Sequence, residues 1–221
     1  MKQKQDLNFF ALSKDSIKEN TFTGIANIMG KMDSYKSVIY PGAFSKEMLE
    51  NFVKDGFISL NHNTAFNDTV ATISRAWVEG NQLLVEAEFH STATANKAKS
   101  ICLERLEKGK SVGLSIGGRG MEFLFSDGEE LIKDMESRNI DMSLVDVDSI
   151  TKHKSYVWGI PSVSSLVETA LTFTPANIGS EVLQLREKMV DEKIEQIALN
   201  EKCRELSLKT LLGRHNNLVR D

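Results

Sequence analysis

Two short segments of the chain carry the residue types that nucleophilic catalysis needs. His62 lies between two asparagines after the apolar run Phe57–Leu60, and Ser115 lies in the apolar, glycine-flanked run Gly113–Gly118. A serine hydrolase needs both side chains, because a hydroxyl becomes a good nucleophile only when a nearby base takes its proton. The pair therefore predicts acyl transfer through Ser115 with His62 as the base. The structural alternatives are a core serine beside a glycine-rich turn and a loop histidine bonded to backbone.

The residues after Ser115 are candidates for stabilising the oxyanion that serine attack creates. The run is typical of a strand that enters a tight turn, in which glycines permit close backbone approach and unusual dihedral angles. The backbone N–H groups of Gly117 and Gly118 are candidate donors to the oxyanion, and the Arg119 guanidinium is an auxiliary positive charge.

An acid that orients the histidine would complete such a site. Glu168 lies within the strand-like run Leu166–Leu171, where a carboxylate is rare unless it is paired or faces solvent. We expect Glu168 to orient His62, with His153 as the rival candidate for this role. A glutamate on the outer face of an edge strand is the structural alternative.

Composition and spacing exclude several other classes of protein. The formal net charge of −4 gives no basic excess, which argues against a nucleic-acid binder. The histidines and acids show no metal-binding spacing, and no phosphate-binding glycine loop precedes a helix, so neither a metal nor a cofactor is expected. No apolar run approaches the length of a membrane span. The isolated Cys102 and Cys203 indicate a reducing compartment, and we expect the chain in the cytoplasm.

Hydrophobic periodicity and turn signals predict a β-rich body with a few helices. The expected strands are Phe22–Met29, Phe57–Leu60, Val70–Val78, Leu83–Phe89, Ser111–Ile116 and Val163–Phe173. Residues 79–82 join the third and fourth of these strands as a hairpin. Ser45 caps a helix that ends at Gly56, and an amphipathic helix covers Thr94–Lys108.

Two parts of the chain stand apart from this body. The polar, acidic segment Asp127–Lys154 is either an insertion or a mobile connection, with a helix near Glu129–Arg138. From Ser180 onward the chain is rich in charge, and apolar residues recur at seven-residue spacing, which is typical of a helix with an imperfect coiled-coil seam. We therefore expect a body over residues 1–179 and a helical tail over residues 180–221.

Four blocks of the sequence, taken in order, resemble those of the prohead maturation proteases of tailed bacteriophages, serine peptidases whose fold is akin to herpesvirus assemblin. The blocks are Asp33 with Tyr40–Phe44, Leu60–Asn63, Gly113–Gly117, and Leu166–Leu171 with Pro175–Asn177. The sequence departs from the family pattern in two places. Gly118 and Arg119 stand where the family usually has a phenylalanine after the glycine, and Asp127–Lys154 lengthens the connection between Ser115 and Glu168.

This resemblance implies an α+β fold with a β-barrel-like, mostly antiparallel core surrounded by helices. It implies a serine endopeptidase in which Ser115 is the nucleophile, His62 the general base and Glu168 the orienting acid, a role that a second histidine has in the herpesvirus relatives. The implied substrate is the scaffolding segment of the major capsid protein, cleaved inside the assembling prohead in the host cytoplasm, followed by self-cleavage. Self-association is also implied, and neither nucleic acid nor a membrane is expected as a partner.

A second hypothesis keeps the same body without the activity. The helix expected over residues 180–212 and the altered pair Gly118 and Arg119 are compatible with an inactive scaffolding or assembly protein that docks on the shell. The two hypotheses differ in one observable, because only a protease loses cleavage when Ser115 is replaced by alanine.

Overall fold

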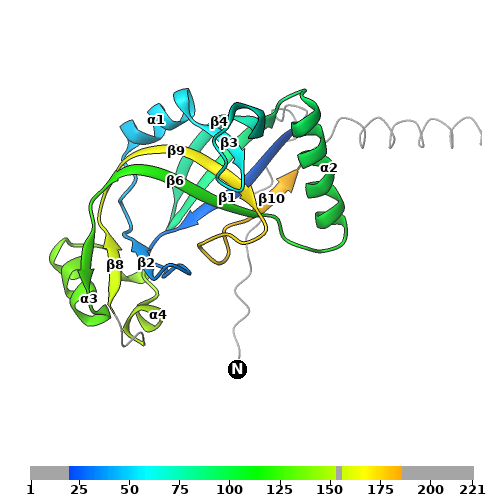
Figure 1. The fold of residues 1–221 in the computed structure, drawn as a ribbon. Coiled ribbons are helices and arrows are strands. Elements are labelled where there is room, and N and C mark those ends of the chain that lie inside the picture. Colours follow the sequence, from blue (N-terminus) through cyan, green and yellow to red (C-terminus); the bar gives the residue numbers. More distant parts are fainter. Residues whose placement is uncertain (1–19, 153–155, 186–221) are drawn as a thin grey trace, which may run out of the picture.

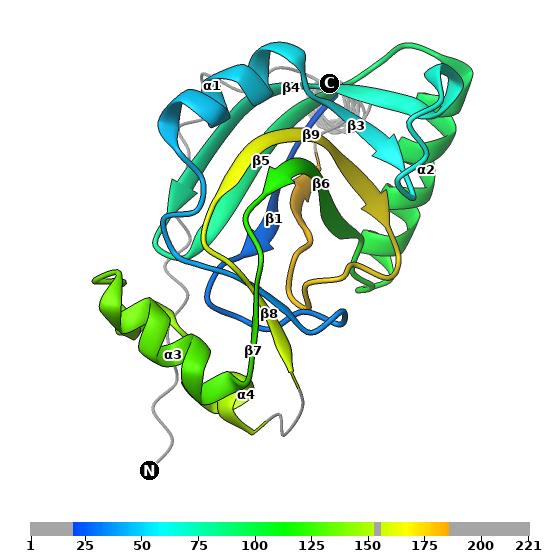
Figure 2. The same cartoon turned by 60° about the vertical axis from the view of Figure 1, so that its left-hand side comes forward.

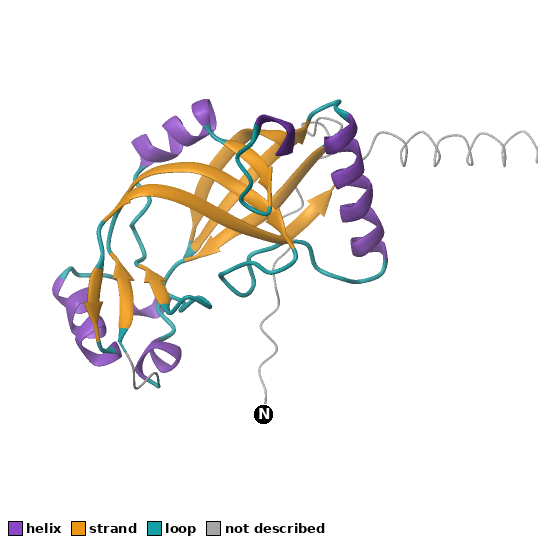
Figure 3. Cartoon of the chain, viewed as in Figure 1, coloured by secondary structure: helices purple, strands orange, loops and turns teal. Residues whose placement is uncertain are grey.

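The computed structural model describes residues 20–152 and 156–185, which form two sheets with helices around them (Figure 1, Figure 3). The strands are β1 Thr21–Ile28, β2 Ser37–Ile39, β3 Phe57–Leu60, β4 Thr69–Glu79, β5 Gln82–Phe89, β6 Gly113–Met121, β7 Leu124–Ser126, β8 Val157–Ile160, β9 Val163–Thr172 and β10 Val182–Leu185. The α-helices are α1 Lys46–Asp55, α2 Ala93–Glu107, α3 Gly128–Ser137 and α4 Val147–Thr151, and the 3-10 helices are η2 Phe66–Asp68 and η3 Met142–Leu144. Helices α1 and α2 flank the larger sheet, whereas α3 and α4 lie beside the smaller one.

Seven strands form one curled sheet with the order β10-β1-β5-β4-β3-β9-β6. Neighbouring strands in this sheet are antiparallel except for β3 and β9, which are parallel. Figure 2 shows the curl, which carries β9 and β6 over in an arch towards β1 and β10. The expected α+β class with a mostly antiparallel sheet is therefore confirmed, and the sheet is curled.

The two edge strands of this sheet meet at the start of β6. The Leu114 N–H donates to Ser180 O at 3.2 Å, and the Val182 N–H donates to Val112 O at 2.8 Å. A Cβ added to Gly24 of β1 would overlap the Leu114 side chain and the backbone of the returning chain, so a glycine is required for this close approach. These contacts close one end of the sheet into a barrel-like shape and fix the start of β6.

The last described strand corrects the expected boundary between body and tail. The seven-residue spacing places Val182–Leu185 in a helix that starts near Ser180, but this segment is strand β10 and pairs antiparallel with β1. Val182 is buried in the main core, whereas Leu183 is exposed to solvent. The backbone pairing of this segment with β1 makes it a strand rather than part of a helical seam. The body thus extends through Leu185, and the rest of the predicted tail, residues 186–221, lies outside the described residues.

Helix α1 begins and ends where the sequence predicts. The Ser45 Oγ accepts the Met48 N–H at 3.2 Å and so caps the N-terminus, while Gly56 ends the helix with its N–H on Phe52 O. Met48 and Phe52 lie on the buried face of α1 and pack in the main core. Because β3 begins directly after Gly56, this helix sets the start of the strand that leads to His62.

The β4–β5 hairpin and helix α2 also form as predicted. Gly80, with φ of +57°, lies in the hairpin turn and supplies the left-handed backbone that such turns need. The Thr92 Oγ1 caps α2 by accepting the Ala95 N–H at 3.2 Å. Gly109, with φ of +65°, follows the end of that helix.

The described part of the segment Asp127–Lys154 packs with β2 and β8 around a second, smaller core. Its helix α3 begins at Asp127, whose carboxylate accepts the Glu130 N–H at 2.9 Å. Beside it, β2, β8 and β7 form a three-stranded sheet in the order β2-β8-β7. The buried residues of this second core are Val38, Tyr40, Leu131, Met135, Ile150 and Val157. The described part of the segment is therefore structured, with helices α3 and α4 and the 3-10 helix η3.

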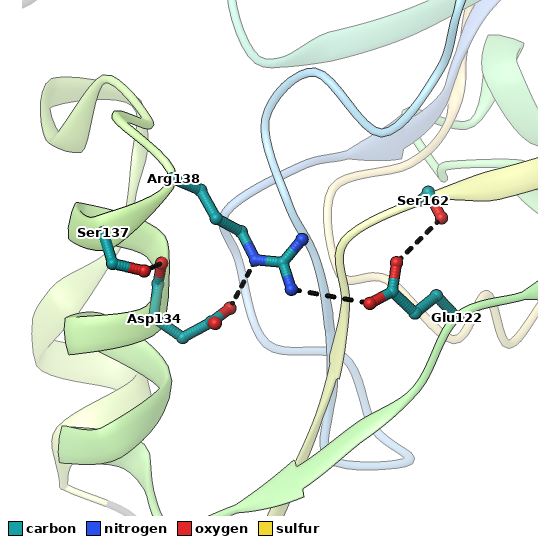
Figure 4. A network of polar contacts seen from close by, with 5 residues as sticks. All are labelled: Glu122, Asp134, Ser137, Arg138 and Ser162. Atoms are coloured by element: carbon teal, nitrogen blue, oxygen red, sulfur yellow. Dashed lines mark hydrogen bonds and ion pairs between the residues drawn. The ribbon is translucent and has the colours of Figure 1, made fainter.

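A network of polar side chains links α3 to the ends of β6 and β9 (Figure 4). The Arg138 Nε contacts Asp134 Oδ2 at 2.9 Å, and its Nη2 contacts Glu122 Oε1 at 3.4 Å. The Ser162 Oγ donates to the second Glu122 oxygen at 3.2 Å. These ion pairs are partly exposed, and such pairs contribute only about 0–1 kcal/mol each. The apolar core is therefore the stronger of the two attachments of α3.

We predict that Leu131→Ala lowers the free energy of unfolding by about 2–5 kcal/mol, because it empties a fully buried site in the second core. Arg138→Ala is expected to cost less than about 1 kcal/mol. Urea unfolding followed by tryptophan fluorescence measures both changes. An Arg138→Ala loss as large as that of Leu131→Ala would contradict the dominance of the apolar core.

Candidate active site

His62 lies in a tight turn that ends β3. The Asn63 N–H donates to Leu60 O at 2.9 Å, and the two central residues, Asn61 and His62, have φ of +50° and +61°. Positive φ at both central positions is the geometry of a type I′ turn. Left-handed backbone is unfavourable for a histidine, and strained residues of this kind concentrate at functional sites. The strain makes the turn a candidate part of a site.

The turn brings the imidazole of His62 against the carboxylate of Glu168. The distance between Nδ1 and Oε1 is 2.6 Å. The Glu168 side chain is 4% exposed and the His62 side chain 44% exposed, so a buried acid holds a histidine that solvent can reach. When the carboxylate is ionised it can only accept a hydrogen bond, and the proton of this contact then lies on Nδ1 of His62.

Two further residues enclose the Glu168 carboxylate. The Ser59 hydroxyl, which is fully buried, donates to Oε2. On the β6 side, a Cβ added at Gly117 would lie 3.1 Å from Glu168 Cδ and closer still to Oε1. The carboxylate therefore occupies the space that any side chain at position 117 would need. A buried carboxylate is stable only when its oxygens are hydrogen-bonded. Here His62 binds one oxygen and Ser59 binds the other.

Ser115 lies on the same face of the sheet as Glu168. It pairs with Ala170 on β9, and Ala170 pairs in turn with Ser59 on β3. Opposed residues of paired strands share a face, and so do residues two apart in one strand. Ser115 is 7% exposed, and among the described residues no hydrogen bond joins its hydroxyl to His62. Hydrogen bonds of catalytic groups often tighten only when substrate binds.

The residues after Ser115 form a strand, so the predicted tight turn is wrong. Strand β6 continues to Met121, and Gly117 and Gly118 both pair with β9. The register shifts between these two pairs, which places one extra residue on β9. Arg119 is also paired with β9 and is exposed. A role for these three residues as oxyanion donors stays a prediction.

Residues of the first and last blocks of the resemblance make contacts that shape the fold. Pro175 packs where Gly113 lacks a side chain, since a Cβ there would lie 2.6 Å from its Cδ. The Asp33 carboxylate accepts the N–H groups of Tyr35 at 2.9 Å and Ser37 at 2.8 Å, which shapes the turn before β2. Burial raises the pKa of Asp33 above its ordinary value, and these hydrogen bonds act against that rise.

Three sequence predictions concern metals, membranes and His153. Within residues 20–152 and 156–185, no group of three or more His, Cys, Asp or Glu side chains is placed to hold a metal ion. No helix in the part of the chain that the structure describes is long and apolar enough to cross a membrane. His153, the rival candidate for orienting His62, lies outside the described residues.

Comparisons with known proteins add one structural likeness. The sequence matches no protein-family model and no curated protein. The structure is similar to that of the capsid assembly protease of bacteriophage T4, with a TM-score of 0.42 and 10% sequence identity, over 69% of this chain and 82% of that chain. The roles of His62, Glu168 and Ser115 are accordingly argued from their own geometry.

Ser59 is the site residue that sequence reasoning missed. It lies in the apolar run of β3, where a serine is an unremarkable strand residue. One feature of the sequence points to it, because side chains alternate between the two faces of a strand. Ile58 is fully buried in the main core, so Ser59 faces the opposite side of the sheet. That side carries Glu168 only because of the parallel register between β3 and β9.

We predict that Gly117→Ala displaces the Glu168 carboxylate and lowers the free energy of unfolding by about 1–3 kcal/mol, because the new Cβ takes the carboxylate's space. The loss of the downfield Nδ1–H proton signal of His62 in the NMR spectrum reports the displacement. Gly118→Ala is the comparison variant, since its Cβ would meet the flexible end of Met121 and lie 3.0 Å from Ser165 O but would not meet the Glu168 carboxylate. It should keep the Nδ1–H signal of His62, and loss of that signal in both variants would contradict the packing of Glu168 against position 117.

A second prediction concerns the left-handed backbone at His62. His62→Ala and His62→Gly both remove the imidazole, but only glycine relieves the strain of a positive φ. We expect the glycine variant to be more stable than the alanine variant by about 1 kcal/mol in urea unfolding. Equal stabilities would indicate that the turn is not left-handed at this residue in solution.

Proposed function

We propose that this chain is a serine endopeptidase in which Ser115 is the nucleophile, His62 the general base and Glu168 the acid that orients the base. The observation that carries this proposal is the 2.6 Å contact between His62 Nδ1 and Glu168 Oε1. With its proton held on Nδ1, the neutral imidazole presents an unprotonated Nε2, which is the acceptor that a serine hydroxyl requires. The placement of Ser115 on the same face of the sheet supports its assignment as the donor.

The proposed reaction follows the acyl-enzyme route. The Ser115 Oγ attacks the scissile carbonyl carbon while its proton passes to His62 Nε2, and the Glu168 carboxylate stabilises the imidazolium that results. The imidazolium then protonates the leaving amine as the tetrahedral intermediate collapses to the acyl-enzyme. Water, activated by the same imidazole, releases the acid product. Gly117, Gly118 and Arg119 remain the candidates for stabilising the oxyanion.

The proposed biological role is maturation of a bacteriophage prohead. It rests on the four sequence blocks that resemble the prohead maturation proteases, and the curled, mostly antiparallel sheet is compatible with the assemblin-like fold of that family. The substrate would be the scaffolding segment of the major capsid protein, cleaved inside the assembling shell in the host cytoplasm. Self-cleavage and self-association belong to the same proposal.

We predict that Ser115→Ala abolishes cleavage of the capsid protein when the two are produced together. His62→Ala should lower the rate comparably, and Glu168→Gln should lower kcat by about 10²–10⁴, because the glutamine amide holds the imidazole in the wrong tautomer. Gel analysis and mass measurement of the products give the cleavage pattern, and labelling by a fluorophosphonate followed by mass spectrometry locates the nucleophile.

Ser164→Ala is the matched control for these variants. Ser164 is an exposed serine of β9 whose hydroxyl donates to Gly120 O at 2.7 Å, so its removal should leave cleavage unchanged. Intact processing by Ser115→Ala would overturn the protease proposal. If no variant alters cleavage and shell assembly still requires the chain, the inactive scaffolding hypothesis is favoured instead.

A further inference from the structure

The Ser59 hydroxyl contacts the buried acid that holds His62. Ser59 is 0% exposed, and its Oγ donates to Oε2 of Glu168, the oxygen that does not contact His62. A carboxylate has two equivalent oxygens and rotates readily about its terminal bond. A fixed donor on one oxygen therefore decides where the other oxygen points.

The backbone of Ser59 is held on both sides by neighbouring strands. It pairs with Ala170 of β9 in the parallel ladder and with Thr69 of β4 in the antiparallel ladder, where the register shifts just before it. Phe57, two residues earlier on the same face, pairs with Glu168. Both partners of the hydrogen bond thus stand on adjacent strands whose relative position is set by backbone hydrogen bonds. A hydroxyl on such a strand is a rigid anchor, as precise positioning of a site requires.

The carboxylate is confined from the remaining side as well. Position 117 holds a glycine whose missing side chain leaves the space that Glu168 fills. Ser59 on β3, Gly117 on β6 and His62 in the turn after β3 therefore surround one carboxylate. Ser59 binds Oε2, and His62 binds Oε1.

We propose that Ser59 is a positioning residue, whose hydroxyl fixes the Glu168 carboxylate so that Oε1 holds His62 with its proton on Nδ1. The effect on catalysis rests on the proposed function of Ser115 and His62. The effect on the histidine tautomer does not, because it depends only on the contacts among Ser59, Glu168 and His62.

The first experiment therefore measures the tautomer in a protein that cannot cleave. In a Ser115→Ala background, the ¹⁵N shifts of His62 and its downfield Nδ1–H proton should show one dominant tautomer with the proton on Nδ1. Adding Ser59→Ala should abolish that proton signal and mix the tautomers, whereas Ser59→Thr, which keeps a hydroxyl, should restore it. An unchanged His62 spectrum in a folded Ser59→Ala protein would overturn the proposal.

Ser74→Ala is the matched control, because Ser74 also donates from a strand to a glutamate, Glu86 Oε1, at 2.9 Å. That pair is exposed and lies on β4 and β5, so its loss should leave the His62 spectrum unchanged. If Ser59→Ala fails to fold, Ser59→Cys, which retains a weaker donor in similar volume, takes its place. In that folded variant a weaker Nδ1–H signal than in Ser59→Thr supports the proposal, and a signal of equal strength overturns it.

The second experiment tests the catalytic consequence by kinetics. Ser59→Ala should lower kcat about tenfold with KM unchanged, since the hydroxyl acts on the base rather than on the substrate. In a Glu168→Gln background the same change should have little further effect, because both act through one carboxylate. An equal loss in both backgrounds would overturn the positioning role. Absence of cleavage by the wild-type chain, combined with the expected tautomer results, would refute the protease proposal and leave the assignment of Ser59 to the histidine tautomer intact.

Discussion

The carboxylate of Glu168 on β9 is buried. It can stay buried only because three other parts of the fold provide hydrogen bonds or space for it. Removing a carboxylate from water costs several kcal/mol unless hydrogen bonds and an opposite partner compensate. Strand β3 provides Ser59, the turn after β3 provides His62, and β6 provides space through Gly117. The parallel pairing of β3 with β9 brings these contributions together. The strained turn at His62 is part of the same arrangement, because the imidazole reaches the carboxylate from it.

The sequence predicts best those elements whose start and end depend on interactions between residues close together in the chain. Helix α1 follows from the cap Ser45 and the stop at Gly56, and the β4–β5 hairpin follows from its turn. Strand β10 does not follow in this way, since Leu183 continues an apolar spacing that is also typical of a helix. Its pairing with β1 decides the outcome, and that pairing joins segments from opposite ends of the described chain. The three-stranded sheet escapes prediction for the same reason.

The residues of the candidate site also differ in how well the sequence predicts them. Residue type and context single out His62, Ser115 and Glu168, because a histidine, a flanked serine and an acid within an apolar run are each unusual enough to notice. Ser59 is not, since a serine in a strand has many uses and its partner is set by the register of β3 against β9. Gly117 shows a further limit. The sequence suggests that its small size permits close backbone approach and unusual dihedral angles, whereas in the structure the space beside it is filled by the Glu168 carboxylate.

Strand β9 lies between β3 and β6 in the sheet, so it separates the strand of the histidine from the strand of the serine and also carries the acid. The contacts of Glu168 with Ser59 and His62 span 109 and 106 residues of sequence, and contacts of such length carry a large loop-closure entropy. They exist only when the intervening chain has folded. A nascent chain that ends before β9 has the serine and the histidine but no surface that joins them. The arrangement of Ser59, His62 and Glu168 therefore exists only in chains whose strand β9 has been made and has paired with β3.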